Sequence, residues 1–214
     1  MIARALRWHC VVPLLALAAC ATTDQQVDAQ TYAPIGPALT RVAVIPFYAH
    51  RLYEGSSRLG GVSPELATER VTRQVTEAML AEGIEIVPVD EIASVFENVA
   101  RATAVIDSQI YAEGAGSSLG ATSVLVGEVL RYRDARGATA PGRHPASVAF
   151  RVTLYEAPDG FKLWSARYDY TQPLPQEKSG SDIHDATLLK RWLTAQEITR
   201  RGADAIAQLL ADAK

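Results

Sequence analysis

The run Val124-Leu125-Val126-Gly127-Glu128-Val129-Leu130-Arg131-Tyr132 predicts a buried β-strand, because β-branched and other apolar residues dominate it. A loop with glycine, proline and arginine follows over 134–145. Apolar and more polar residues then alternate over 148–155, which is the period of a strand with one buried face. The turn Pro158-Asp159-Gly160 leads into a partner strand over 161–170, so this half of the chain contains an antiparallel hairpin.

The first half of the chain predicts two β-α units in succession. A buried strand over 41–47 precedes a helix that Ser63 caps and Gly83 ends. A short strand over 84–88 precedes a second helix, which Asp90 caps. Strands joined by helices run parallel, whereas hairpin strands are antiparallel. We therefore expect an α/β fold with a mixed sheet in a single domain.

Two further helices are predicted. The segment 104–119 is interrupted by glycines and fits one short helix. A long final helix, capped by Asp185, is expected to pack on the sheet with Trp192 as an anchor in the core. Its apolar stripe consists of Leu188, Trp192, Ala195, Ile206 and Leu209.

The amino-terminal segment predicts export. Arg4 and Arg7 precede an apolar run over 11–19 that is too short to span a bilayer, which is typical of a secretory signal peptide over 1–19. The polar, proline-containing segment 20–40 predicts a flexible tether. The folded domain is then expected over 41–214.

Composition narrows the function classes. The chain has 21 basic and 24 acidic residues, and residues 1–19 hold two arginines and no acid, so the remainder has a net charge of −5. This balance argues against nucleic acid as a partner. Cys10 leaves with the signal peptide and Cys20 is the other cysteine of the chain, so we expect neither a disulfide nor a thiolate metal site.

The sequence Leu17-Ala18-Ala19-Cys20 resembles the lipobox of bacterial lipoproteins. The resemblance implies cleavage before Cys20 and acylation of its thiol and new amino terminus. Several acyl chains hold a protein at a membrane far more firmly than one. Ala21, standing where aspartate would signal retention, implies sorting to the outer membrane. The alternative is an ordinary signal peptide that contains Ala-Ala-Cys by chance.

Three segments in order, 41–47, 119–129 and 155–165, resemble the curli-secretion lipoprotein superfamily. Its relatives include lipoprotein activators of peptidoglycan synthases and auxiliary lipoproteins of exopolysaccharide export. The resemblance implies an anticodon-binding-like α/β domain in the periplasm, anchored by lipid to the outer membrane. It implies a non-enzymatic factor for envelope assembly, secretion or polysaccharide export. The implied partners are envelope proteins or glycan machinery, with a homo-oligomer as a further partner and with no cofactor.

The chain gives little support for catalysis. Ser181, His184 and Asp185 crowd together, but side chains so close in sequence point apart and do not converge as a triad. His50 and His144 have no partner at metal-ligand spacing. We therefore expect no catalytic residue and no metal site, and a hydrolase is the less favoured reading.

A candidate partner interface lies in the loop expected after the first strand. Tyr48, His50, Arg51, Leu52 and Tyr53 combine aromatic and cationic groups, a mixture common in binding interfaces. The alternative is that Leu52 and Tyr53 cover the edge of the core.

A subunit of an outer-membrane secretion pore is the alternative function. The hairpin over 148–170 nearly supplies two membrane strands, and Arg151 and Arg167 would then face the lumen. The hairpin also carries Leu163-Trp164-Ser165, which resembles the core hairpin of the superfamily. This second resemblance favours a role in the core.

Overall fold

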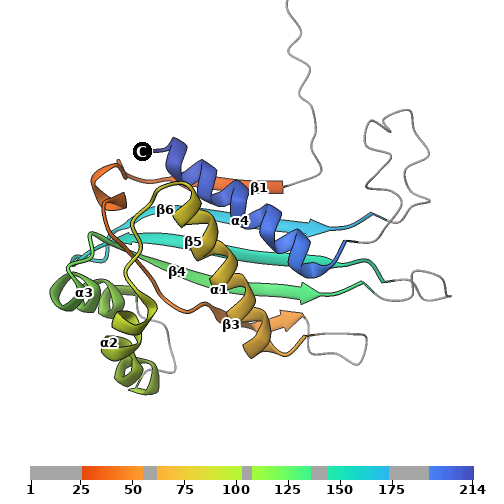
Figure 1. Cartoon of the computed structure of the whole chain (residues 1–214), viewed down its shortest axis with the longest axis horizontal. Helices are drawn as coiled ribbons and strands as arrows, with labels where there is room; N and C mark the ends of the chain where they lie inside the picture. The colour runs from red at the N-terminus through yellow and green to blue at the C-terminus, as the bar shows by residue number, and fades with distance from the viewer. Residues whose placement is uncertain (1–25, 55–61, 103–107, 136–143, 174–192) are drawn as a thin grey trace, which may run out of the picture.

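The predicted hairpin and the long strand before it lie inside a six-stranded mixed sheet (Figure 1). The computed structural model describes residues 26–54, 62–102, 108–135, 144–173 and 193–214. In chain order the elements are β1 (Gln26–Thr31), the 3₁₀ helix η1 (Pro37–Leu39), β2 (Val42–Val44), β3 (Tyr48–Glu54), α1 (Pro64–Ala81), α2 (Val89–Ala102), α3 (Ser108–Leu119), β4 (Ser123–Arg133), β5 (Ser147–Glu156), β6 (Lys162–Thr171) and α4 (Ala195–Asp212).

Strand β4 organises the sheet. The strand order is β1-β6-β5-β4-β2, and β3 also pairs with β4. Both β2 and β3 run parallel to β4, whereas β5 is antiparallel to β4 and β6 to β5. These pairings confirm the predicted single-domain α/β fold with a mixed sheet and an antiparallel hairpin.

Helices α1 and α4 pack on one face of the sheet, where they contact β4, β5 and β6 (Figure 1). Helices α2 and α3 cover the opposite face at one end, over β2 and the start of β4. The apolar side chains of the hairpin point toward α1 and α4 and have no exposed surface. They are Val148, Phe150, Val152 and Leu154. The predicted core role of the hairpin is therefore confirmed.

Helix α1 follows the sequence prediction closely. The Ser63 hydroxyl accepts a hydrogen bond from the Leu66 backbone N–H at 3.4 Å, and Pro64 occupies the first turn. After the helix, Gly83 has a φ of +73°, a conformation that glycine adopts without strain. The buried stripe includes the predicted Ala67, Val71, Val75, Ala78 and Met79.

Helix α4 begins later than predicted. Thr194, rather than Asp185, is its cap, and Thr194 and Glu197 form a reciprocal capping box. Residues 174–192, which include Asp185, Leu188 and Trp192, lie outside the described residues. Ala195 and Ile206 are buried as predicted, but Leu209 is 38% exposed. Leu210 is buried in its place, because it lies one helical turn beyond Ile206 on the same face.

The predicted tether is wrong from Gln26 onward. Strand β1 pairs antiparallel with β6 from Gln26 opposite Asp169 to Thr31 opposite Trp164. Farther along, Ile35 and Leu39 are buried in the core. Backbone pairing with β6 and the packing of Val27 against the core hold β1 in the sheet. The folded domain therefore includes residues before Arg41.

The predicted strand over 84–88 is reduced to one parallel bridge between Val42 and Ile86. The Val42 N–H donates to the Glu85 carbonyl at 2.8 Å, and the Val87 N–H donates to the Val42 carbonyl at 2.9 Å. Helix α2 then begins at Val89, so Asp90 lies in its first turn instead of capping it. The predicted short helix within 104–119 is confirmed as α3. No helix within the described ranges is long and apolar enough to cross a membrane.

Candidate functional site

The candidate interface residues lie on strand β3, not in a loop. The pairing places Tyr48 opposite Glu128 and Ala49 opposite Val129 on β4. Pro46 does not end the pairing with β4. The Ile45 N–H before it donates to the Leu125 carbonyl at 3.0 Å, and Tyr48 after it pairs with Glu128. The chain therefore continues beside β4, and the predicted loop is corrected to a strand.

Tyr53 on β3 serves the core. Its hydroxyl lies 3.1 Å from the Val62 carbonyl and 3.3 Å from the Tyr132 carbonyl, and these two oxygens share its single hydrogen. Burial raises the pKa of Tyr53 to about 12, with smaller contributions from Tyr132 and Glu65. Tyr53 is partly buried and packs against the core.

Leu52 and Arg51 differ from Tyr53. The Leu52 side chain is 72% exposed, so it does not cover the core, and Arg51 is also exposed. The Leu52 backbone N–H donates to His50 Nδ1 at 3.0 Å, which holds this part of β3 in place. The structure therefore leaves an exposed leucine and an exposed arginine on β3, between Ala49 and Glu54, where the register with β4 shifts.

Tyr48 and His50 face Glu128 of β4. His50 Nε2 lies 3.6 Å from Glu128 Oε1, and the Glu128 side chain is only 12% exposed. Burial, followed by the neighbouring Glu128 carboxylate, raises the pKa of Tyr48 to about 12. The Tyr48 phenol is therefore a neutral group near neutral pH.

Ion pairs continue from Glu128 across the sheet. Arg151 Nη1 lies 3.4 Å from Glu128 Oε2, and Arg167 Nη2 lies 2.8 Å from Asp169 Oδ2. Arg131 makes a close ion pair with the same Asp169. The alternation of residues in the hairpin places both Arg151 and Arg167 on the face away from the core. The ion pairs could not be predicted, because the sequence alone does not give the register between the strands.

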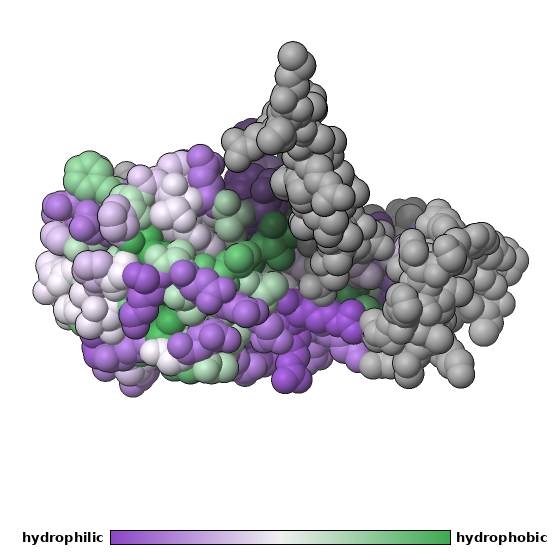
Figure 2. Space-filling model, turned by 90° about the horizontal axis from the view of Figure 1, so that it is seen from above, coloured by the Kyte–Doolittle hydropathy of each residue, from purple (hydrophilic) through white to green (hydrophobic). Residues whose placement is uncertain are grey.

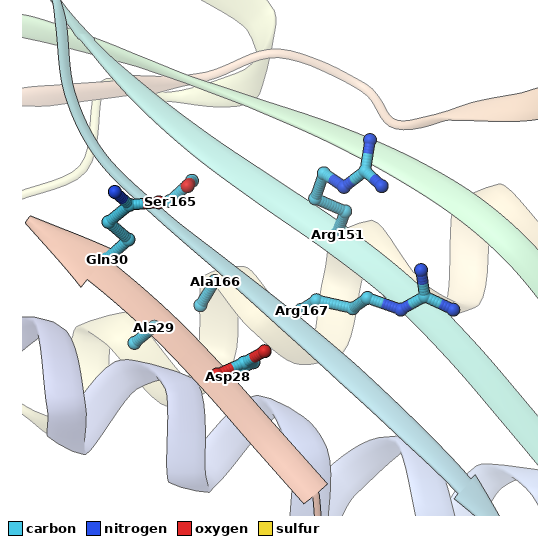
Figure 3. A pocket seen from close by; sticks show the side chains of 7 residues that line it. All are labelled: Asp28, Ala29, Gln30, Arg151, Ser165, Ala166 and Arg167. Carbon is cyan, nitrogen blue, oxygen red and sulfur yellow. The ribbon is translucent and has the colours of Figure 1, made fainter.

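A shallow cavity of about 360 Å³ lies beside this network, over β1, β5 and β6. Its polar lining comes from Asp28, Gln30, Arg151, Ser165 and Arg167 (Figure 3). Figure 3 shows these side chains on the side of the sheet that faces the viewer, with the helices behind the sheet. The cavity therefore opens on the face that α1 and α4 do not cover.

The exposed large apolar side chains are dispersed over the fold. They come from different elements and include Leu52 on β3, Leu80 on α1, Val89 on α2 and Phe161 before β6. The surface seen in Figure 2 accordingly mixes hydrophobic and hydrophilic residues. On that face no single apolar band dominates.

The residues weighed for catalysis are only partly described. Ser181, His184 and Asp185 lie outside the described residues, as does Cys20. His144 lies just before β5 and is partly exposed. Within the described part of the chain, no three His, Cys, Asp or Glu side chains are grouped so as to hold a metal ion.

No protein-family model matches the chain, and no curated protein matches it. Among solved structures, the chain is similar to the PelC dodecamer from Paraburkholderia phytofirmans, at 15% identity over 87% of this chain and 96% of that chain, with a TM-score of 0.52. Lipoprotein GNA1162 from Neisseria meningitidis matches at 20% identity over 67% and 86% of the two chains, with a TM-score of 0.35. The LpoB C-terminal domain from Escherichia coli matches at 15% identity over 64% and 85%, with a TM-score of 0.41. The similarity to PelC shows a shared fold, and the structures that resemble the chain include bacterial lipoproteins.

Proposed function

We propose that this protein is a non-enzymatic accessory factor of the bacterial envelope, anchored to the outer membrane through an acylated Cys20. Its α/β domain lies in the periplasm and binds protein or glycan machinery for envelope assembly, secretion or polysaccharide export. The lipobox over 17–20 and the fold shared with PelC support this placement.

The exposed part of β3 is the observation that carries the proposal. Leu52 is 72% exposed beside the exposed Arg51, in the part of β3 between the residues Ala49 and Glu54 that pair with β4. Within the described residues, no strand pairs with the other edge of β3. An edge strand offers unpaired backbone groups to a partner, and arginine is enriched at interfaces. We therefore place the partner interface on Tyr48, His50, Arg51 and Leu52, with Tyr53 supporting the strand from the core side.

The packing of the hairpin favours an accessory role over a pore. The apolar side chains of β5 lie beneath α1 and α4 and have no exposed surface, so they are not available to lipid. Arg151 and Arg167 lie on the opposite face, where they form ion pairs within the domain. In this conformation the hairpin belongs to the core of the domain.

Self-association is part of the proposal. PelC, which shares the fold, is a dodecamer in its solved structure. We expect the full-length chain in detergent to sediment as a closed oligomer rather than a monomer. If the chain is a monomer at every protein concentration, the proposed self-association is contradicted, but the proposed binding of other envelope components is not.

The β3 interface is tested by comparing two exposed leucines. Leu52→Glu places a charge in the proposed contact, whereas Leu80→Glu makes the same change on α1, where Leu80 is 53% exposed. Both variants are expected to fold, because neither leucine is buried. Crosslinking in living cells, followed by mass spectrometry, should show partner capture lost in Leu52→Glu and retained in Leu80→Glu. Equal capture by the two variants would contradict the interface.

A further inference from the structure

Four charged residues form a row across four strands. The register places Glu128 on β4 opposite Arg151 on β5, Arg151 opposite Arg167 on β6, and Arg167 opposite Asp28 on β1. Directly opposed residues have Cβ atoms about 4.5–5.5 Å apart, and like charges at this distance repel. The positive charges of Arg151 and Arg167, in the middle of the row, therefore repel each other.

The row lies on the face away from α1 and α4. The neighbours of Arg151 along β5, Phe150 and Val152, are fully buried in the core, and alternation turns Arg151 to the other side. On β6 the same holds for Arg167, which lies between two buried residues. Both arginine side chains are about half exposed, at 48% and 47%.

Among the described residues, carboxylates satisfy these arginines only in part. Three arginines, Arg131, Arg151 and Arg167, share the two carboxylates Glu128 and Asp169. Each guanidinium has five N–H donors, and a half-exposed guanidinium with one carboxylate partner has donors left for a ligand. Figure 3 shows the Arg151 and Arg167 side chains extending to the same side of the sheet from neighbouring strands. Their guanidinium groups point toward Glu128 and Asp169, so donation to one bound group requires these half-exposed side chains to rotate over the cavity that both line.

The rest of the cavity supplies neutral and acidic hydrogen-bonding groups. Gln30 and Ser165 line it beside the arginines, and Asp28 lies next to Arg167 on β1. At its border, the Tyr32 hydroxyl donates to Gln30 Oε1 at 2.9 Å and lies 3.4 Å from Ser165 Oγ. The Tyr32 ring is thus held at the rim of the cavity, and this residue is 46% exposed.

Lys162 fixes the position of Tyr32. Its Nζ donates to the Tyr32 hydroxyl at 2.9 Å and lies 4.3 Å from the centre of the Tyr32 ring. The cavity therefore has a cationic pair at one side and a positioned aromatic ring at its rim.

We propose that this cavity binds the carboxylate-bearing sugar of an acidic polysaccharide. Guanidinium groups match a carboxylate with paired hydrogen bonds, so Arg151 and Arg167 would hold the sugar carboxylate. Asp28, Gln30 and Ser165 offer acceptors and donors for sugar hydroxyls. The polar, shallow cavity offers no apolar pocket for a peptide side chain, which favours a sugar over a peptide.

This sugar site is separate from the proposed partner interface on β3, and the two proposals are tested by different experiments. Binding to the full-length chain in detergent is measured by calorimetry with an oligogalacturonate, a linear sugar chain that has one carboxylate per unit. Arg151→Gln and Arg167→Gln should each weaken binding by about tenfold or more, because each removes charge-assisted hydrogen bonds. Arg167→Lys should fall between wild type and Arg167→Gln, because lysine keeps the charge but not the planar fork.

Arg73→Gln is the matched control. Arg73 on α1 is likewise about half exposed and paired with one acid, Glu69 at 3.6 Å, but it lies outside the cavity. It should bind the oligogalacturonate like wild type. The ligand should also raise the unfolding temperature of wild type and of Arg73→Gln, but not that of Arg151→Gln.

Three results would overturn the proposal. One is an oligogalacturonate affinity that does not change in Arg151→Gln and Arg167→Gln. Another is equally tight binding of an uncharged galactan oligomer, which would remove the role of the carboxylate. The third is equally tight binding of a polyglutamate peptide, which would make the site one for acidic peptides. None of these results bears on partner capture through Leu52.

Discussion

Gly202→Ala is expected to destabilise the domain although alanine is the better helix former. In the middle of a helix, alanine in place of glycine gains about 1 kcal/mol of intrinsic stability. At Gly202, however, an added Cβ would lie 2.5 Å from Tyr168 Cδ1 and 2.7 Å from two further ring atoms. The Tyr168 ring is fully buried on β6 and cannot swing into solvent. Overpacking of this kind costs about 1–3 kcal/mol, and so close a contact belongs at the upper end of that range.

The net expectation is a loss of about 1–2 kcal/mol in the free energy of unfolding. Urea denaturation followed by circular dichroism should show a lower midpoint with an unchanged slope. Gln208 on the exposed face of α4 provides the control, because the difference between Gln208→Ala and Gln208→Gly reports the helix preference alone. A midpoint for Gly202→Ala equal to or above that of wild type would refute the packing argument.

Three further predictions concern the sheet. Burial works to raise the pKa of Asp169, but the hydrogen bond from Arg167 and the charge of Arg131 outweigh it and hold the pKa below its usual value. Ionised Asp169 therefore stabilises the fold above the unfolded pKa, and this contribution is lost as the pH falls through the folded pKa. Thermal unfolding should show a larger loss for wild type than for Asp169→Asn between about pH 5 and pH 3. A chain without Gln26–Thr31 should unfold at a lower urea concentration than one that begins at Gln26, because β6 loses one of its two partner strands; equal midpoints would contradict the place of β1 in the fold. The buried Tyr168 hydroxyl has no hydrogen-bond partner among the described residues, so Tyr168→Phe should leave the free energy of unfolding unchanged or raise it by up to about 1 kcal/mol, and a clear loss would show a missed partner.

The elements that could be predicted from the sequence carry their burial in their own residues. Strands β4, β5 and β6 and helix α1 have apolar residues at the period of their structure, and the structure buries those residues. Strand β1, with the sequence Gln-Val-Asp-Ala-Gln-Thr, has only Val27 and Ala29 to alternate with polar residues, and Ala29 is exposed, so the signal was too weak to predict its pairing with β6. Strand β3 was not predicted, because it pairs with β4 shortly after a proline, a residue that was expected to end the strand.

The candidate site was predicted only in part. The alternation in the hairpin indicates that Arg151 and Arg167 share a face, but only the register shows that they are direct neighbours. The start of α4 did leave a signal in the sequence, because Thr194-Ala195-Gln196-Glu197 has the spacing of a capping box. This capping-box spacing indicates the first residue of α4 correctly, whereas the choice of Asp185 as the cap did not.

Fractionation of cells that make wild type or Cys20→Ala, each with residues 1–19 intact, tests most directly whether this protein is a lipid-anchored envelope factor. Wild type should be found in the outer-membrane fraction, and mass spectrometry should show an acylated amino-terminal cysteine. Cys20→Ala should appear in the soluble periplasmic fraction, because the lipobox over 17–20 no longer ends in the residue that is acylated. Equal retention of both proteins in the outer membrane, or a wild-type protein without acyl chains, would contradict the lipoprotein assignment.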